Sequence, residues 1–93
     1  MIRSFADKET ERVWAEERSR RLPPEIQGPA LRKLQLIDAA GSIEDLRIPP
    51  GNRLEQLKGD RQGEWSIRVN QQWRICFAWR DGNAEDVEIC DYH

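Results

Sequence analysis

The only tyrosine and the only histidine of this 93-residue chain are adjacent, at Tyr92 and His93. A histidine titrates close to neutral pH and can give or take a proton during a reaction. A tyrosine ring can stack on a base or orient reacting groups. Chain termini usually fray and tolerate almost any residue. The ending "EICDYH" is therefore predicted to be held in place and used.

The middle of the chain is basic, although the formal net charge is −2. Residues 47–80 contain seven Lys and Arg against three acidic residues, whereas residues 1–46 sum to −1 and residues 81–93 to −5. A basic segment suits an anionic partner such as a nucleic acid, whereas the total charge argues against one. An ordinary solvated surface is the alternative interpretation.

Two helices are expected in the first half of the chain. Residues 7–21 have the pattern of a charged helix that buries Val13 and Trp14, and "LPPE" ends it because proline does not continue a helix. A second helix is expected at residues 24–40, followed by a capped turn at "SIEDL". Its apolar residues recur with the helical period at Ile26, Ala30, Leu34 and Ile37.

The second half alternates between apolar and polar residues, as strands do. Strands are expected at residues 53–57, 65–70, 73–79 and 85–90, with a polar loop at 58–64 and a tight turn at "RDGN". "MIRSF" suits an edge strand. The predicted fold is α+β: a single domain, residues 1–93, with two N-terminal helices packed on one face of a small twisted antiparallel sheet.

The alternation sorts the strand residues onto two faces. One face, directed toward the helices, carries Trp65, Ile67, Val69, Trp73, Ile75, Phe77, Trp79, Val87 and Ile89. Outward-pointing side chains on the other face are Ser66, Arg68, Asn70, Arg74, Cys76, Ala78, Arg80, Glu88, Cys90 and Tyr92. His93 follows Tyr92, and the loop that joins two of these strands carries Lys58 and Arg61. Cations and both titratable aromatic groups are thus expected on one surface.

Such a surface has the groups needed to cleave RNA by attack of its own 2′-hydroxyl. Arg and Lys stabilise the phosphate charge, since a guanidinium matches two phosphate oxygens, and His93 could transfer the proton. Asp91 could bond to a neighbouring side chain or hold the terminal backbone. Plainer roles are a cross-strand ion pair between an outward Arg and Glu88, and a surface position for Lys58. Pattern alone predicts an α+β domain that could bind RNA.

Several classes of protein are disfavoured by the composition. Cys76 and Cys90 are the only cysteines, which argues against a disulfide framework or structural zinc, and one histidine is poor material for a transition-metal site. No apolar run approaches the length of a bilayer span, and "MIRSFADKET" lacks the apolar core of a signal peptide. A cytoplasmic protein without metal or membrane contact is expected.

The order of the motifs is more informative than any single motif. "PPGNRLEQLKGDRQGEWSIRVNQQWRICFAW", closed by "VEICDYH", resembles the HigB-type (plasmid maintenance killer) branch of the RelE/ParE toxin superfamily. "MIRSF" at the start and "LxxIDAA" in the second helix extend the resemblance over nearly the whole chain. Within that branch, "PPGNRLE" is similar to the GraT-type toxins.

The resemblance implies a RelE/ParE-like fold and a toxin of a type II toxin–antitoxin system. Toxins of the HigB branch are endoribonucleases that cut mRNA during translation, in the A site of the 70S ribosome, without metal or cofactor. They thereby inhibit translation and growth. The implied partners are the ribosome, mRNA and a helix-turn-helix antitoxin of the HigA/GraA type. That antitoxin also represses the shared promoter, so the toxin would meet promoter DNA only indirectly.

The resemblance also implies a set of catalytic residues. The family's lysine in "LKG" falls on Lys58, its arginine in "WRI" on Arg74, and its closing triplet on Asp91, Tyr92 and His93. Some HigB toxins carry a catalytic arginine where this chain has Asn70, and Arg68, on the same strand face, is expected to take that role. Lys58, Arg68 and Arg74 would bind phosphate, Tyr92 would stack on a base, and His93 would be a general acid or proton-transfer group. Further RNA or ribosome contacts are expected from Arg53, Arg61, Asn70 and Arg80.

Two other functions fit the same fold. ParE-type members of the superfamily inhibit DNA gyrase and lack the combined catalytic set, so Lys58, Arg74 and the Asp-Tyr-His ending argue against that activity. A domain that binds an antitoxin without being toxic is the second alternative.

Overall fold

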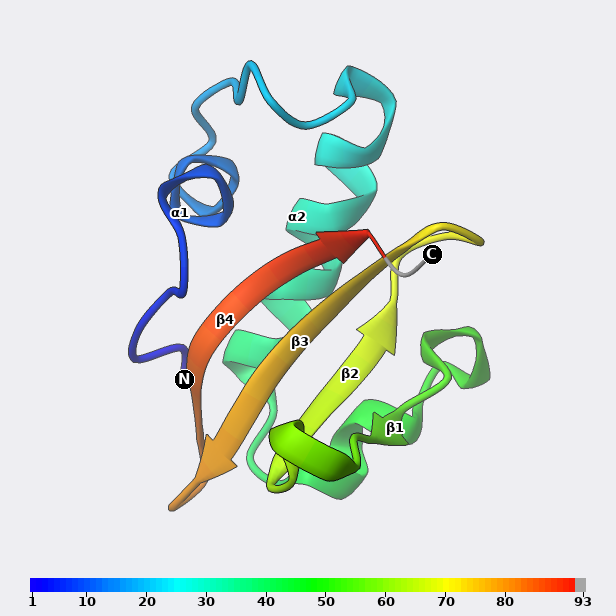
Figure 1. The fold of residues 1–93 in the computed structure, drawn as a ribbon. Helices are drawn as coiled ribbons and strands as arrows, with labels where there is room; N and C mark the ends of the chain where they lie inside the picture. The colour runs from blue at the N-terminus through cyan, green and yellow to red at the C-terminus, as the bar shows by residue number, and fades with distance from the viewer. Residues whose placement is uncertain (92–93) are drawn as a thin grey trace.

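The computed structural model describes residues 1–91 and has an α+β fold, as predicted (Figure 1). Two helices precede a four-stranded antiparallel sheet in which the strands follow their order in the chain. The helices are α1 (Lys8–Trp14) and α2 (Pro24–Ala39), and the strands are β1 (Glu55–Gln56), β2 (Glu64–Arg68), β3 (Trp73–Arg80) and β4 (Asn83–Asp91). Short 3₁₀ segments lie at Ile43–Arg47, Pro50–Asn52 and Gly59–Arg61.

Helix α1 is shorter than predicted. It begins after Asp7, whose side chain accepts a hydrogen bond of 2.7 Å from the Thr10 amide, and it ends at Trp14 rather than near residue 21. Glu16 has a φ of +61°, and the amides of Glu16 and Glu17 bond back to the carbonyls of Val13 and Arg12. This hydrogen-bond pattern closes a helix. The prediction failed because Glu16 stops the helix by adopting the left-handed conformation, which residues other than glycine seldom adopt.

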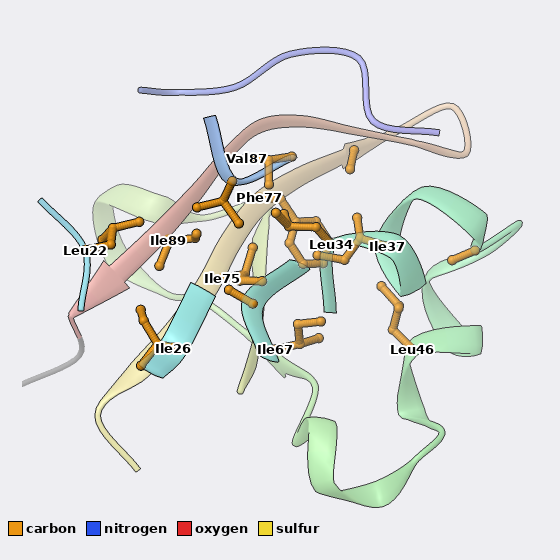
Figure 2. Close-up of a cluster of buried hydrophobic side chains, with 14 residues drawn as sticks. Leu22, Ile26, Leu34, Ile37, Leu46, Ile67, Ile75, Phe77, Val87 and Ile89 are labelled. Carbon is orange, nitrogen blue, oxygen red and sulfur yellow. The ribbon is translucent and has the colours of Figure 1, made fainter. Parts of the chain in front are cut away.

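Helix α2 agrees with its prediction to within one residue at its C-terminal end. Pro24 lies in its first turn, where a missing backbone N–H costs nothing. Its predicted apolar stripe is buried, and Figure 2 shows Leu34 and Ile37 gathered with Phe77 of β3. Figure 1 shows α2 running behind the sheet. The core therefore lies between α2 and strands β2 to β4.

The sheet also departs from the prediction at its two edges. Strand β1 has two residues instead of five, because Arg53 has a φ of +46° and cannot continue an extended strand. The N-terminal "MIRSF" segment forms only isolated parallel bridges, from Ile2 to Ala84 and from Phe5 to Val87. The β3–β4 turn is tight, as predicted, with positive φ at both Asp81 and Gly82.

The expectation that side chains opposite α2 point outward to solvent is wrong in the middle of the sheet. Ser66, Arg74, Cys76 and Ala78 are buried. Chain segments cover them, because Arg53 bonds to Arg74 through its carbonyl and Arg61 reaches across to Glu88. Strand alternation gave the correct faces, but it does not predict which loops fold over a face.

Neither helix of the described chain, residues 1–91, has both the length and the apolar character that crossing a bilayer requires.

Thr10 ties α1 to the last strand. It is fully buried, and its Oγ1 accepts a hydrogen bond of 2.9 Å from the Ile89 amide on β4, two residues before Asp91. We expect Thr10→Val, which is similar in shape, to lower the free energy of unfolding by about 1–3 kcal/mol because a buried amide loses its partner.

Urea unfolding measures this loss. Thr10→Ser, which keeps the hydroxyl, is the matched control and should lose less stability than the valine variant. Equal losses in the two variants would show that the Ile89 hydrogen bond contributes little.

Candidate active site

Three of the six predicted catalytic residues meet where β2 ends, β3 begins and β4 ends. In the register of the sheet, Arg68 lies opposite Arg74, and Arg74 lies opposite Cys90. One step along, Trp73 lies opposite Asp91. Three of the predicted residues, Arg68, Arg74 and Asp91, are thus brought together at one end of the sheet.

Arg74 is the only described cation with less than a tenth of its surface exposed, at 8%. Its Nε donates to Ser66 Oγ at 2.9 Å, and its Nη2 donates to the Arg53 carbonyl at 2.7 Å. The same Nη2 lies 3.7 Å from Glu55 Oε2. A buried charge is tolerated only when it is bonded in this way. The guanidinium is therefore fixed in position before any ligand binds.

Arg68 is a half-buried neighbour of Arg74 on the adjacent strand. Its Nε donates to the Asn70 carbonyl at 3.0 Å. Like charges placed directly opposite each other on neighbouring strands are destabilising. The Glu55 carboxylate, 3.7 Å from Arg74 Nη2, relieves part of that repulsion, and a bound anion would relieve it further.

The β2–β3 turn holds the end of β4. Asn70 Oδ1 accepts hydrogen bonds of 2.8 Å from both the Gln72 and the Trp73 amides, which fixes the turn. Gln72 then donates from Nε2 to Asp91 Oδ2 at 2.9 Å. Asn70 was predicted to contact RNA, but its side-chain oxygen is engaged in the turn. Asp91 is exposed and is held beside Trp73.

Lys58 lies at the other end of β2 from Arg68. It follows Leu57, whose amide donates to the carbonyl of Glu64, the first residue of β2. At about 3.3 Å per strand residue, the backbones of Glu64 and Arg68 are roughly 13 Å apart. Lys58 is exposed and lines a shallow hollow with Gln56, Leu57, Gly59 and Gln62. Lys58 is therefore remote from the backbone of Arg68, whereas the Arg74 guanidinium reaches back along β2 to Ser66 and Glu55.

The remaining predicted RNA-binding arginines differ in their surroundings. Arg53 is exposed and contributes its carbonyl to Arg74. Arg61 donates through Nη2 to Glu64 and Glu88, both at 3.0 Å, and the bond to Glu64 raises the pKa of the guanidinium further. Arg80 is bonded to Glu85 at 2.6 Å and lies at the end of β3 remote from Arg74.

Cys76 and Cys90 are neighbouring thiols whose pKa values shift in opposite directions, since the hydrogen bond between them lowers the pKa of Cys76. Cys76 is buried and Cys90 is half-buried. A hydrogen bond with Cys76, together with burial, raises the pKa of the Cys90 thiol, so Cys90 stays protonated at neutral pH. A protonated thiol is a poor nucleophile and a poor metal ligand. In the part of the chain from 1 to 91, no group of His, Cys, Asp and Glu is suited to hold a metal ion.

Tyr92 and His93 lie outside the described residues. Their predicted roles therefore stay predictions from the sequence.

Three residues that support this site were missed from the sequence: Ser66, Glu55 and Gln72. Ser66 and Arg74 lie on one face of adjacent strands, two residues out of register, which is the diagonal neighbour position. Pairing "WSIRV" against "WRICF" around the Asn70 turn would have identified Ser66. Glu55 and Gln72 come from a strand edge and a turn, and no local pattern marks their contacts.

The site can be compared with known proteins. The family model described as "RelE-like toxin of type II toxin-antitoxin system HigB" matches residues 3–93. The chain is 47% identical over 85 residues to "Toxin HigB-1" of Vibrio cholerae serotype O1, covering 90% of each chain. It is 36% identical over 93 residues to "Endoribonuclease HigB" of Proteus vulgaris, covering both chains completely.

A solved structure supports the fold. The YoeB–YefM complex of Staphylococcus aureus superimposes with a TM-score of 0.63 and 18% identity, over 100% of this chain and 98% of that chain. At that identity, the likeness concerns the fold alone.

Ser66 gives a first test of this geometry. We expect Ser66→Ala to lower the free energy of unfolding by about 1–3 kcal/mol, because it leaves a buried charged donor without its partner. Ser4→Ala is the matched control, since the Ser4 hydroxyl accepts only an exposed bond from the Asp86 amide. Urea unfolding of both variants measures the difference.

A double-mutant cycle with Arg74→Met tests whether the stability lost in Ser66→Ala comes from the hydrogen bond to Arg74. If Ser66 acts through Arg74, the cost of Ser66→Ala should largely disappear in the Arg74→Met background. Additive costs would contradict the proposed contact.

Asn70 gives a second test. Asn70→Arg introduces the arginine that some HigB toxins carry at this position, and it removes the side-chain amide that holds the turn. The Oδ1 acceptor for two amides is lost, so we expect the free energy of unfolding to fall by about 1 kcal/mol. Asn70→Asp keeps an acceptor oxygen and should be closer to the wild type. Thermal unfolding distinguishes them, and equal stability of the two variants would refute the role of Asn70 in the turn.

Proposed function

The chain belongs to the HigB family of RelE-like toxins of type II toxin–antitoxin systems, and on that premise we propose that it is a ribosome-dependent endoribonuclease. In this proposal it enters the A site and cuts mRNA during translation. The name of the Proteus vulgaris relative supports the nuclease activity. Residues 1–93 would act as one toxin domain.

One observation carries the proposal: the Arg68–Arg74 pair at the end of the sheet that leads to the Asp-Tyr-His ending. Arg74 is fixed by Ser66 and Arg53, and Arg68 lies opposite it. The N–H groups of both guanidiniums that these bonds leave over would donate to the oxygens of one phosphate, and Arg74 would exchange its Glu55 contact for it. Asp91, the first residue of the closing triplet, is paired with Trp73 on the same strand as Arg74.

The proposed reaction is attack of an RNA 2′-hydroxyl on the adjacent phosphate, which breaks the bond to the 5′-oxygen and leaves a 2′,3′-cyclic phosphate. Arg68 and Arg74 would stabilise the charge that develops on the phosphate oxygens. His93 would donate the proton to the leaving 5′-oxygen, and Tyr92 would stack on a base to align the nucleotide. The 2′-hydroxyl proton would pass to solvent water, and His93 would regain its proton from solvent afterwards, so the step balances without an added metal or cofactor.

The other residues predicted from the sequence would act around the arginine pair. Lys58, at the far end of β2, would contact the RNA backbone, together with exposed Arg53. Arg61 and Arg80 would have to exchange their carboxylate partners for RNA in order to bind it. Asn70 would act through the turn, and Arg68 would take the place of the family's arginine.

One face of the sheet would meet the RNA, and the toxin would have three partners. Both helices would cover one face of the sheet, leaving the opposite face to the RNA; the shared core of Val13, Ile26, Leu34 and the sheet supports this. The partners would be the 70S ribosome, mRNA and a helix-turn-helix antitoxin of the HigA/GraA type, in the cytoplasm. The fold shared with a toxin solved in complex with its antitoxin agrees with such a partner.

In vitro translation of a defined mRNA tests the proposal, with new 5′ ends mapped by primer extension. We expect cleavage only when ribosomes are present and translating. His93→Ala should lower the cleavage rate by about 10²- to 10⁴-fold, since that is the usual contribution of a general acid. Gln71→Ala, an exposed change in the neighbouring turn, is the control and should cleave like the wild type.

Intact mRNA with the wild-type protein would overturn the proposal. Inhibition of gyrase supercoiling would then favour a ParE-like activity. Normal growth after induction without any antitoxin would favour a non-toxic antitoxin-binding domain.

A further inference from the structure

The described cations are unequally available to a partner. Of the seven in residues 47–80, four are in ion pairs with nearby carboxylates: Arg47, Arg61, Arg74 and Arg80. The basic segment of the sequence is therefore largely neutralised within the fold. This raises the question of where a protein with a net charge of −2 could hold on to an anionic partner.

A second group of cations lies in the loop between α1 and α2. Arg18, Arg20 and Arg21 fall within four residues, and all three are exposed. Within residues 1–91, none of the three forms an ion pair, although Glu16 and Glu17 precede them. They form the densest cluster of unpaired guanidiniums in the described chain, and we refer to residues 18–21 as the arginine loop.

The backbone of the arginine loop is held stiffly by the residue between the arginines. Ser19 is 2% exposed, and its Oγ donates to Glu9 Oε1 at 2.6 Å and accepts from the Arg21 and Leu22 amides. Gln27 of α2 bonds to both the amide and the carbonyl of Ser19, at 3.1 and 2.9 Å. The loop is thus anchored from both helices. Its conformation does not depend on the arginine side chains.

The arginine loop is close to the part of the molecule that leads to the closing triplet. Leu22, which follows the loop, belongs to the same buried cluster as Ile89 of β4 and lies near it in Figure 2. α1, to which the loop is attached, bonds through Thr10 to the Ile89 amide. The loop is therefore joined to β4 through the core on the helix side of the sheet, and it presents a surface separate from the Arg68–Arg74 pair on the opposite face.

We propose that Arg18, Arg20 and Arg21 form a second RNA-binding surface, which contacts the phosphate backbone of ribosomal RNA while the Arg68–Arg74 pair acts on mRNA. This rests on the proposed function, which it deepens by assigning the ribosome contact. Because the backbone of the loop is already anchored, binding phosphates would order only the arginine side chains and not the chain that carries them. Phosphate contacts of this kind position a protein without reading sequence.

The test is the salt dependence of binding to vacant 70S ribosomes, measured at several KCl concentrations. Each phosphate contact contributes about 0.7 to 0.9 to the slope of log affinity against log salt. The triple variant Arg18→Gln, Arg20→Gln, Arg21→Gln should lower that slope by about 2 and weaken binding by about tenfold or more at low salt. Its melting temperature should be unchanged, because Ser19 and Gln27 hold the loop.

A matched control removes the same charge elsewhere. Arg3→Gln, Lys8→Gln, Arg32→Gln changes three cations that also lack ion pairs in the described chain and lie outside the loop. It should leave the slope nearly at the wild-type value. Equal slopes for the two triple variants would overturn the inference.

Two further outcomes separate the inference from its premise. A wild-type protein that neither binds ribosomes nor cleaves mRNA would refute the proposed function itself. Binding and cleavage by the wild type, together with an unaltered slope in the loop variant, would refute the arginine loop alone.

A loss of affinity for an acidic decapeptide of glutamate, without a loss for ribosomes, would overturn the inference in favour of a protein partner.

Discussion

The burial of the Arg74 guanidinium is the constraint on which the rest of the structure depends. A charge in that position must be satisfied by fixed partners, and these come from β2 through Ser66 and from the segment before β1 through Arg53. The contacts hold the Arg53 carbonyl and the Glu55 carboxylate against the open face of the sheet. They also leave Arg74 directly opposite Arg68. One buried side chain thus sets both the cover of this face and the cation pair at its end.

Several acidic residues of the described chain act as internal partners of its cations. Glu44, Glu55, Glu64, Glu85 and Glu88 each neutralise an arginine of the basic segment. The electrostatic field of the protein is therefore concentrated at a few places rather than spread over the sheet. This distribution reconciles a negative total charge with binding to an anionic partner, since discrete sites and not the net charge govern local attraction.

Much of the fold could be predicted from the sequence where local signals agree. Helix α2 has its apolar stripe and an N-terminal proline, and β3 and β4 have alternation and an Asp-Gly turn. The failures occur where tertiary contacts override the local pattern. Glu16 stops α1 in a left-handed conformation that its sequence does not favour.

The candidate site was predictable in part for the same reason. Alternation placed Arg68 and Arg74 on one face, but it did not reveal that Arg74 is buried, because Arg53 and Glu55 contact it from another part of the chain. Resemblance to a family identified Asn70 as a position of functional interest. Its hydrogen bonds to the Gln72 and Trp73 amides could not be predicted, because they depend on the three-dimensional geometry of the turn.

The central claim is that one phosphate of the RNA sits between Arg68 and Arg74. The most direct measurement is a structure of the protein on a 70S ribosome carrying mRNA with 2′-O-methyl groups, which cannot be cleaved. The account predicts a phosphate within hydrogen-bond distance of both guanidiniums, with Arg74 still bonded to Ser66. A complex in which the RNA backbone meets neither arginine, or in which the protein binds outside the A site, would contradict it.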